Sequence, residues 1–444
     1  MKRYFYLFAC VTMMFVACSE KNPVNQSVIQ IEEQKTNEED STSIPKDTIQ
    51  PSDDTIPAPQ QLVFSSAEEQ LHYRTNEFSI NMLSMIGRSE NAKENICFSP
   101  LSASMALGIL MNGADGNTLT EMQKTLGFDG LTEEEINNYY YKLLAELPRL
   151  DNTTIIKLAN SLWVRNDFPL DAGYKEKTRT YFYATIENVD KFTSQMTLDL
   201  INGWAAINTN DLVREVLTRD MVSDLTVMIF ANALYFKAKW LYEFDTYSTF
   251  QENFTTLQGQ QISIDMMHDC SYYPYIETDD AQLIELNYEG RQYCMDILLP
   301  AENVSLEQYL STLTYEKWEE YLKQMNQTKY VALSMPKFKF AYNRDLKADL
   351  VAAGIRDAFS ANNANFSRLS NYGTFLSFIK QYCYMSVNEG GTEAAAVTIG
   401  GLETTGEHTE MKYFKANRPF IFFIREKKYN TLLFTGIVGD PTQE

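Results

Sequence analysis

The chain has 444 residues, and 13% of them are aromatic, including 27 Tyr and 26 Phe, which is enough apolar surface for a large core and excludes a disordered protein. Acidic residues outnumber basic ones by 59 to 38, and the resulting charge of −21 speaks against a nucleic-acid partner. The three histidines, His72, His268 and His408, are far apart in the sequence. This spacing predicts no metal site, no cofactor and no histidine-rich catalytic cluster.

The first 17 residues have the features of an export signal. Lys2 and Arg3 precede an apolar run, Tyr4 to Ala17, that is too short to span a bilayer as a stable helix. The segment Phe15-Val16-Ala17-Cys18 resembles a bacterial lipobox, although Phe15 stands where Leu is usual. We therefore expect residues 1–17 to be a cleaved lipoprotein signal peptide and Cys18 to carry the lipid. The alternative is an ordinary secretory peptide with a chance cysteine.

Residues 18–66 are predicted to form a flexible, lipid-anchored tether. The segment is poor in aromatic residues and rich in Asn, Gln, Ser, Thr, Pro and acidic residues, as in Glu38-Glu39-Asp40. Together with the signal it predicts an exported protein, anchored as an outer-membrane lipoprotein of a Gram-negative bacterium and either periplasmic or surface-exposed. We favour surface display, because a long tether allows contact with large partners.

After the tether, helical and strand patterns alternate along the chain. Apolar residues have helical spacing from Leu71 to Met85, and Ser99-Pro100 has the cap serine and first-turn proline of a second helix. β-Branched and aromatic runs predict strands, and two later segments return to helical spacing. In chain order these are strands 227–236 and 294–299, helix 306–325, strand 330–340, helix 346–353 and strand 420–425. The pattern predicts an α+β domain at residues 67–444.

Four cysteines of this domain, Cys97, Cys270, Cys294 and Cys383, have no C-x-x-C spacing and lie in apolar or aromatic surroundings. We expect thiols buried in the interior. Export also permits a disulfide, but the spacing does not require one.

The most unusual segment runs from Glu389 to Thr409. Within it, small residues alternate with period two: Thr392, Ala394, Ala396, Thr398 and Gly400. One interpretation is a turn of exposed helix followed by a flexible loop. The other is a loop that can enter an existing sheet as a strand, because a face of small side chains needs no deep pockets. Gly390 and Gly391 would then be the point where insertion begins.

Asn388 to Thr398 (NEGGTEAAAVT) strongly resembles the hinge of inhibitory serpins. The resemblance extends from about Glu68 to Glu444, through five further blocks in the right order. These are Asn95–Ser102, Asn232–Trp240, Met335–Phe338, Asn417–Phe420 and Phe434–Gly436. It implies a serpin fold: a large central β-sheet, further sheets, surrounding helices and an exposed reactive loop at about residues 389–413.

The resemblance also implies roles for individual residues. The hinge would comprise Glu389, Gly390, Gly391, Thr392, Glu393, Ala394, Ala395, Ala396, Val397 and Thr398. The region where the main sheet opens would contain Asn95, Ser99, Ser102, Asn232 and Trp240. Glu389 resembles an acidic residue that pairs with a base on a neighbouring strand. Two positions depart from the family: Gln381 replaces a histidine that many serpins have, and Ala238 replaces a common glycine.

A serpin is not an enzyme, so the resemblance implies a monomeric suicide inhibitor that supplies no catalyst. The target protease, of the serine or papain-like cysteine type, forms an acyl-enzyme on the loop, and the cleaved loop then inserts into the main sheet. The alternative is a non-inhibitory serpin-fold binding protein. A surface hydrolase is poorly supported, because no nucleophile elbow is present.

The bond that the protease attacks is predicted at Thr405-Gly406, from the family's usual spacing after Glu389. Spacing counted back from Pro419 instead indicates His408, so the alternatives are Thr404, Glu403, Glu407 and His408. No Arg or Lys lies between Thr392 and Glu410, which argues against trypsin-like targets. An elastase-like or subtilisin-like protease, or a papain-like one, fits this segment better.

Overall fold

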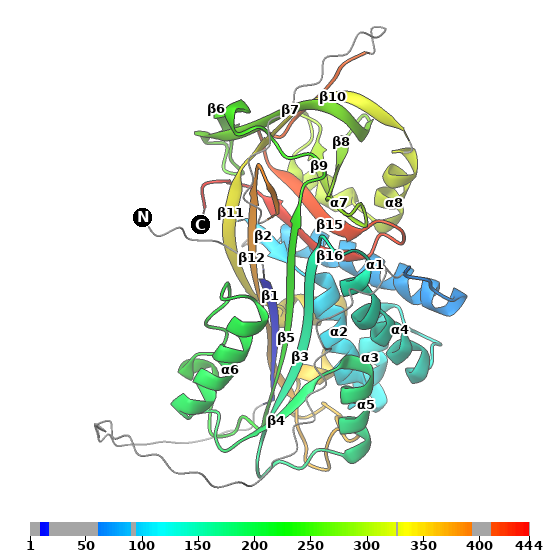
Figure 1. Cartoon of the computed structure of the whole chain (residues 1–444). Coiled ribbons are helices and arrows are strands. Elements are labelled where there is room, and N and C mark those ends of the chain that lie inside the picture. Colours follow the sequence, from blue (N-terminus) through cyan, green and yellow to red (C-terminus); the bar gives the residue numbers. More distant parts are fainter. Residues whose placement is uncertain (1–8, 17–60, 90–94, 326, 393–409, 444) are drawn as a thin grey trace, which may run out of the picture.

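The computed structural model describes residues 9–16, 61–89, 95–325, 327–392 and 410–443. Helices and strands both contribute to the architecture, and two large sheets lie at its centre (Figure 1). The α+β prediction is therefore confirmed.

The helices are concentrated in the first half of the described chain. They are α1 (Ser66–Gly87), α2 (Pro100–Met111), α3 (Gly116–Leu126), α4 (Glu133–Glu146), α5 (Ala172–Phe182), α6 (Gln195–Asn208), α7 (Leu306–Thr312), α8 (Tyr315–Gln324) and α9 (Lys347–Ala353).

The main sheet has, within the described residues, seven strands. In spatial order they are β11 (Phe338–Asp345), β12 (Leu376–Asn388), a position shared by β1 (Ala9–Val16) and β13 (Gly391–Thr392), then β5 (Met228–Lys239), β3 (Ile155–Arg165) and β4 (Thr185–Val189).

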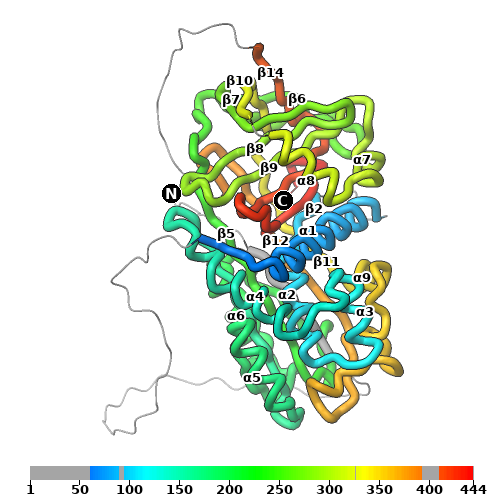
Figure 2. Tube along the Cα trace, turned by 90° about the vertical axis from the view of Figure 1, so that its right-hand side faces the viewer, coloured from blue at the N-terminus to red at the C-terminus, as the bar shows by residue number. Residues whose placement is uncertain are grey.

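The second sheet continues from one end of the molecule into the core. Its spatial order is β14 (Lys412–Lys415), β10 (Thr328–Pro336), β7 (Gln261–Glu277), β8 (Ala281–Asn287), β9 (Tyr293–Pro300), β15 (Phe420–Glu426), β16 (Leu432–Val438) and β2 (Ile96–Phe98), with β6 (Thr249–Thr255) paired to β7. We call β6, β7, β10 and β14 the upper sheet. Figure 2 shows these four strands together at one end of the molecule.

The two faces of the main sheet have different apolar cores. On β5, Phe230, Leu234 and Phe236 belong to the large core, which also contains the apolar residues of α2. Ile229, Ala231 and Ala233 belong instead to a smaller core with residues of α6. In Figure 1, α6 accordingly lies on one side of the main-sheet strands and α2 on the other. Alternate residues of β5 therefore face different cores.

The predicted start of the second helix is confirmed. The Ser99 side chain accepts a hydrogen bond from the Ser102 amide, and Pro100 occupies the first turn of α2. All residues of α2 are buried.

Two predicted elements are each divided in the structure. The helix predicted at 306–325 ends at Thr312, because Leu313 is extended, and the Thr314 side chain then caps α8. The strand predicted at 330–340 is interrupted at Lys337. Before it, β10 pairs with β7 and β14, whereas β11 pairs with β12 in the main sheet. The chain thus passes from one sheet to the other at Lys337.

The packed part of the chain begins before residue 67, where the tether was predicted to end. Leu62 and Phe64 are only 1% and 6% exposed, and the Phe64 ring lies 4.4 Å from that of Tyr429. Ser65 and Glu68 form a capping box at the start of α1, directly after Phe64. This box fixes the direction in which the chain enters the helix, and the two apolar side chains before it pack in the core. In the described part of the chain no helix is both long and apolar enough to cross a membrane.

Three of the four cysteines of the domain are buried as expected: Cys97, Cys294 and Cys383. Cys270 is exposed on β7, so the prediction of burial is wrong there. Its strand is covered on only one face, and residue 270 lies on the other. No disulfide links these four cysteines.

Candidate functional site: the hinge and the opening of the main sheet

The predicted hinge begins at the top of the main sheet. After β12, Glu389 and Gly390 form a turn, and β13 then runs back between β12 and β5. Thr392 pairs with Val387 on one side and with Ala238 on the other, antiparallel to both. The first two residues of the returning segment thus already occupy a strand position within the sheet. Residues 393–398 of the predicted hinge lie outside the described residues.

Position 391, where the chain turns back between β12 and β5, requires a glycine. Its φ is +138°, and a Cβ atom added there would lie 2.5 Å from the Ala238 carbonyl oxygen. A side chain would collide with backbone that cannot move aside. The start of insertion at Gly391 stays a prediction.

Trp240 and Tyr288 hold the first hinge residues in place. The indole Nε1–H of Trp240 donates to the Asn388 carbonyl at 2.9 Å, and its ring stacks on Tyr288 with centroids 4.8 Å apart. The Tyr288 hydroxyl is 2.6 Å from the Thr392 hydroxyl, and both residues are buried. Sequence reasoning named Trp240 but missed Tyr288, because one tyrosine among many carries no signal of its own.

Glu389 has the basic partner that the resemblance implied. Its carboxylate accepts a hydrogen bond from the Thr249 hydroxyl at 2.9 Å and lies 3.1 Å from the Lys337 ammonium. Burial acts to raise the pKa of Glu389, but hydrogen bonds from backbone and Thr249, together with Lys337, outweigh it and lower the pKa below 4.5. Lys337 is the residue at which the chain changes sheets, so this contact joins the hinge to both sheets.

Glu389→Gln is expected to destabilise the fold by about 1 kcal/mol at pH 7, because the ionic contact with Lys337 is lost. A carboxyl with a lowered folded pKa stabilises the protein above its unfolded pKa and loses that effect as pH falls through the folded pKa. The difference between the two proteins should therefore be constant above about pH 5 and disappear in stronger acid. Urea unfolding at several pH values measures it; a difference that persists at low pH would contradict the ionic origin.

Below the hinge, polar side chains of the main sheet bond to the start of α2 and to one another. Gln381 of β12 makes a pair of hydrogen bonds with the backbone of Ser99: it accepts from the amide at 3.0 Å and donates to the carbonyl at 2.9 Å. Asn232 of β5 donates to the Asn160 side chain at 2.7 Å. Gln381, which departs from the family's histidine, thus anchors β12 to the first turn of α2.

The residues predicted for the sheet-opening region have different contacts in the structure. Ser99 and Ser102 begin α2 beside Gln381 of β12, Asn232 lies on β5, and Trp240 contacts the hinge. Asn95 instead accepts hydrogen bonds from the amides of Gly439 and Asp440, at 2.8 and 2.9 Å. It fastens the end of the chain after β16, because the backbone amides there have no strand partner.

Comparison with known proteins agrees with this geometry. The family model described as "Serpin (serine protease inhibitor)" matches residues 73–441. The chain belongs to the serpin family. Members of this family are in general protease inhibitors and not enzymes.

Three similar proteins illustrate the range of this serpin's relatives. An uncharacterized serpin-like protein of Methanosarcina acetivorans is 30% identical, over 91% of this chain and 95% of its own length. The native state of tengpin, a thermophilic serpin, has a TM-score of 0.76 at 31% identity and covers 86% of this chain and 97% of its own. Thyroxine-binding globulin in complex with thyroxine has a TM-score of 0.74 at 25% identity, covering 84% and 99%.

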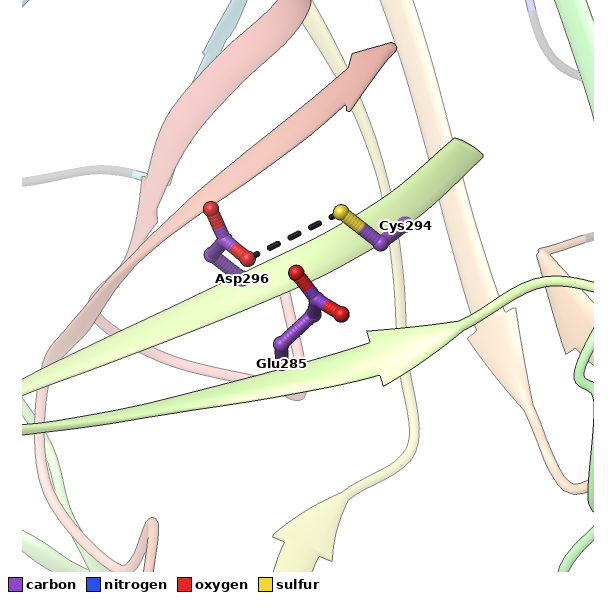
Figure 3. Close-up of side chains that lie close together, drawn as sticks. All are labelled: Glu285, Cys294 and Asp296. Atoms are coloured by element: carbon purple, nitrogen blue, oxygen red, sulfur yellow. Dashed lines mark hydrogen bonds between the residues drawn. The ribbon is translucent and has the colours of Figure 1, made fainter. Parts of the chain in front are cut away.

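The serpin also contains a buried group of side chains that could in principle hold a metal. Glu285, Cys294 and Asp296 place ligand atoms within 4.8 Å of one another on β8 and β9 (Figure 3). However, Arg425 contacts Glu285 and Asp296, each at 2.6 Å, and Lys427 contacts Glu285 at 2.6 Å. Two cations already neutralise the two carboxylates, and burial raises the pKa of the Cys294 thiol, which disfavours a thiolate ligand. The donor set therefore suits an ion-pair cluster and not a metal.

Proposed function

We propose that this serpin is a suicide inhibitor that forms a covalent acyl complex with a protease and then inserts its cleaved loop into the main sheet. The observation that carries the proposal is the position of β13, which starts a strand antiparallel to both β12 and β5. We call the strand-wide position between β12 and β5 the slot. When a protease cleaves the loop beyond Thr392, the part that follows β13 can continue along this slot as a strand. If about 15 residues insert at ~3.3 Å each, the attached protease moves on the order of 50 Å. This displacement would distort the active site of the protease, including its oxyanion-binding donors. The acyl-enzyme would then be hydrolysed slowly.

The register supports a fit for the small residues of the loop. Extending the pairing of Thr392 with Ala238 brings Ala394 opposite Phe236 and Ala396 opposite Leu234. These residues of β5 face the large core, so the small side chains of the inserted loop would lie over it. Glu393 would lie on the other face. The small residues of the loop would thus lie on the face of the main sheet that packs against the large core, where close packing leaves the least space for side chains.

The same register brings Thr398 between Asn232 and Gln381. Among the described residues, the Asn232 Oδ1 atom is buried and has no hydrogen-bond partner. A buried acceptor without a partner costs about 1–3 kcal/mol, so a hydroxyl arriving beside it would stabilise the inserted state. This gives insertion a specific polar contact in addition to the backbone ladder.

The slot already accepts a strand from elsewhere in the chain. β1, part of the predicted signal peptide, pairs with β12 and β5, and Thr12 has Gln381 and Asn232 as its partners. Its sequence Ala9-Cys10-Val11-Thr12 resembles Ala395-Ala396-Val397-Thr398 of the loop in the equivalent register. Loop and β1 cannot occupy the slot together. Removal of residues 1–17 at export would leave it available for the loop.

We further propose that the attacked bond is Thr405-Gly406, with Glu403, Thr404, Glu407 and His408 as alternatives; all lie outside the described residues. An elastase-like or subtilisin-like serine protease, or a papain-like enzyme, suits this segment, which has no Arg or Lys. We also propose that the protein acts as a monomer, anchored by lipid on Cys18 to the outer membrane of a Gram-negative bacterium. The predicted signal and tether support this localisation.

The test is to mix the protein starting at residue 18 with elastase-, subtilisin-, papain- and trypsin-type proteases and to look for an SDS-stable complex. We expect a complex with one of the first three and a released peptide that begins at or near Gly406. The full chain with residues 1–17 retained is the control, and it should be cleaved with little complex formed, because β1 fills the slot. Cleavage of the shorter protein without a complex, and without a gain in thermal stability, would exclude loop insertion.

A second candidate is a serpin-fold binding protein that does not inhibit. Thyroxine-binding globulin, a structural relative, forms a complex with the small molecule thyroxine. The hinge argues against this for our chain, because the residues that would face the core, Thr392, Ala394, Ala396 and Thr398, are all small. A protein with no need to insert its loop has no reason to keep that face small.

A further inference from the structure

The upper sheet has an exposed aromatic face next to the end of the reactive loop. Tyr272 of β7 lies opposite Tyr330 of β10, with ring centroids 5.2 Å apart, and one row further along Ala332 pairs with Tyr413 of β14. Directly paired residues share a face of a sheet, so the three tyrosines point the same way. Tyr272 and Tyr413 are 52% and 68% exposed. Large exposed aromatic groups gathered on one face are typical of docking surfaces.

A second exposed aromatic group connects this face to the start of the loop. Tyr242, which follows β5, is 64% exposed, and it lines a shallow pocket together with Trp240 and Tyr272. Trp240 is the residue that holds the hinge at Asn388. The aromatic surface formed by Tyr242, Tyr272, Tyr330 and Tyr413 therefore extends from the point where the loop leaves the main sheet to the point where it returns at β14.

Two lysines of β14 at the border of this surface have acidic partners. The Lys415 ammonium lies 2.7 Å from the Glu252 carboxylate, and Lys412 lies 2.8 Å from Glu410. An uncharged partner surface can approach this border without leaving an unpaired charge buried.

Chain length decides which partner reaches this surface. The described chain resumes at Glu410, and the proposed bond Thr405-Gly406 is at most ~18 Å away at ~3.6 Å per residue. A protease domain of about 220 residues has a radius of gyration on the order of 17 Å. A body of that size that holds the bond in its cleft therefore lies close to the upper sheet and within reach of its exposed face.

We propose that the aromatic surface formed by Tyr242, Tyr272, Tyr330 and Tyr413 is a docking site for the target protease, which binds it through an uncharged, apolar rim beside its active-site cleft. This inference rests on the proposed function, since the occupant is the enzyme that cuts the loop. The tyrosines would supply affinity for the whole protease, whereas the loop sequence selects its primary pocket. Two χ angles per tyrosine keep the entropy cost of docking low.

The experiment compares the protein starting at residue 18, in which β1 is absent, with its double variant Tyr272→Ser/Tyr413→Ser. The readout is kcat/KM for cleavage within residues 393–409 by the protease that cuts there most rapidly, measured also on a synthetic peptide of that segment. We expect kcat/KM on the protein to fall at least about 10-fold in the double variant, as for the loss of interface hot spots. The peptide, which has no docking surface, gives the rate expected without docking. Tyr372→Ser is the matched control, since Tyr372 is 61% exposed and precedes β12 at the far end of the main sheet.

An unchanged kcat/KM in the double variant, or an equal fall in Tyr372→Ser, would overturn the docking site. Thermal unfolding of each variant shows whether a fall in rate reflects loss of fold, and Tyr272→Phe/Tyr413→Phe should restore most of the rate. Failure of the proposed function has a different signature: the wild-type loop is cut but no complex is trapped. Because kcat/KM reports docking and cleavage whether or not trapping follows, the two failures can be told apart.

Discussion

Ala394→Arg is expected to convert the protein from an inhibitor into a substrate. In the extended register, residue 394 lies opposite Phe236 of β5 and Met385 of β12, both buried in the large core. An arginine there would have to be buried without a partner, which costs several kcal/mol. Since 1.36 kcal/mol is tenfold in rate, insertion should slow by about 100-fold or more, and the protease should deacylate first.

The measurement is the number of inhibitor molecules cleaved for each protease molecule trapped, read from the ratio of complex to cleaved product on a denaturing gel. Glu393→Arg is the matched control, because residue 393 would lie on the opposite face, opposite the partly exposed Lys237. It should still form the complex. If both variants trap the protease equally well, loop insertion in this register is wrong.

Arg425→Leu is expected to be the most destabilising of the single substitutions considered. Arg425 is almost fully buried and contacts Asp296 and Glu285 at 2.6 Å, and it also donates to the Asn430 side chain at 2.9 Å. Removing one partner of a buried ion pair costs about 3–5 kcal/mol, because the remaining charge has no compensation. Burial raises the pKa of Asp296, and Arg425 is the charge that opposes this rise. Without Arg425, the pKa of Asp296 should rise further, so that Asp296 takes up a proton more readily.

Urea unfolding at neutral and acid pH tests this prediction. The loss of stability in Arg425→Leu should be largest at high pH and smaller in acid, where a protonated Asp296 needs no cation. Arg214→Leu, at a side chain that is 75% exposed, is the matched control and should change the free energy of unfolding by less than about 0.5 kcal/mol. Adding Asp296→Leu to Arg425→Leu should recover part of the loss. If it does not, the cluster is not coupled as the contacts indicate.

The site itself was only partly predictable from the sequence. The alternation of small residues from Thr392 to Gly400 is a local pattern, so it could be recognised without knowing what it packs against. The contact between Glu389 and Lys337 joins residues that the chain separates widely, and only the resemblance to serpins indicated that a base would be there. Tyr288, Thr249 and the bidentate hydrogen bonds of Gln381 carried no sequence signal, because their roles depend on partners brought in by the sheets.

The α+β class, the positions of α1, α2, α9, β5, β9 and β15, and the small-residue face of the loop could be read from the sequence, since these depend on propensity and periodicity over short stretches. The three-dimensional fold decided that β12 and β5 leave a strand-wide position between them, that β13 starts in it, and that the chain changes sheets at Lys337. It also decided that Cys270 is exposed and that Asn95 fastens the end of the chain. The physical reason is that pairing between distant strands and burial on one face of a sheet depend on which segments meet, and a local pattern does not contain that information.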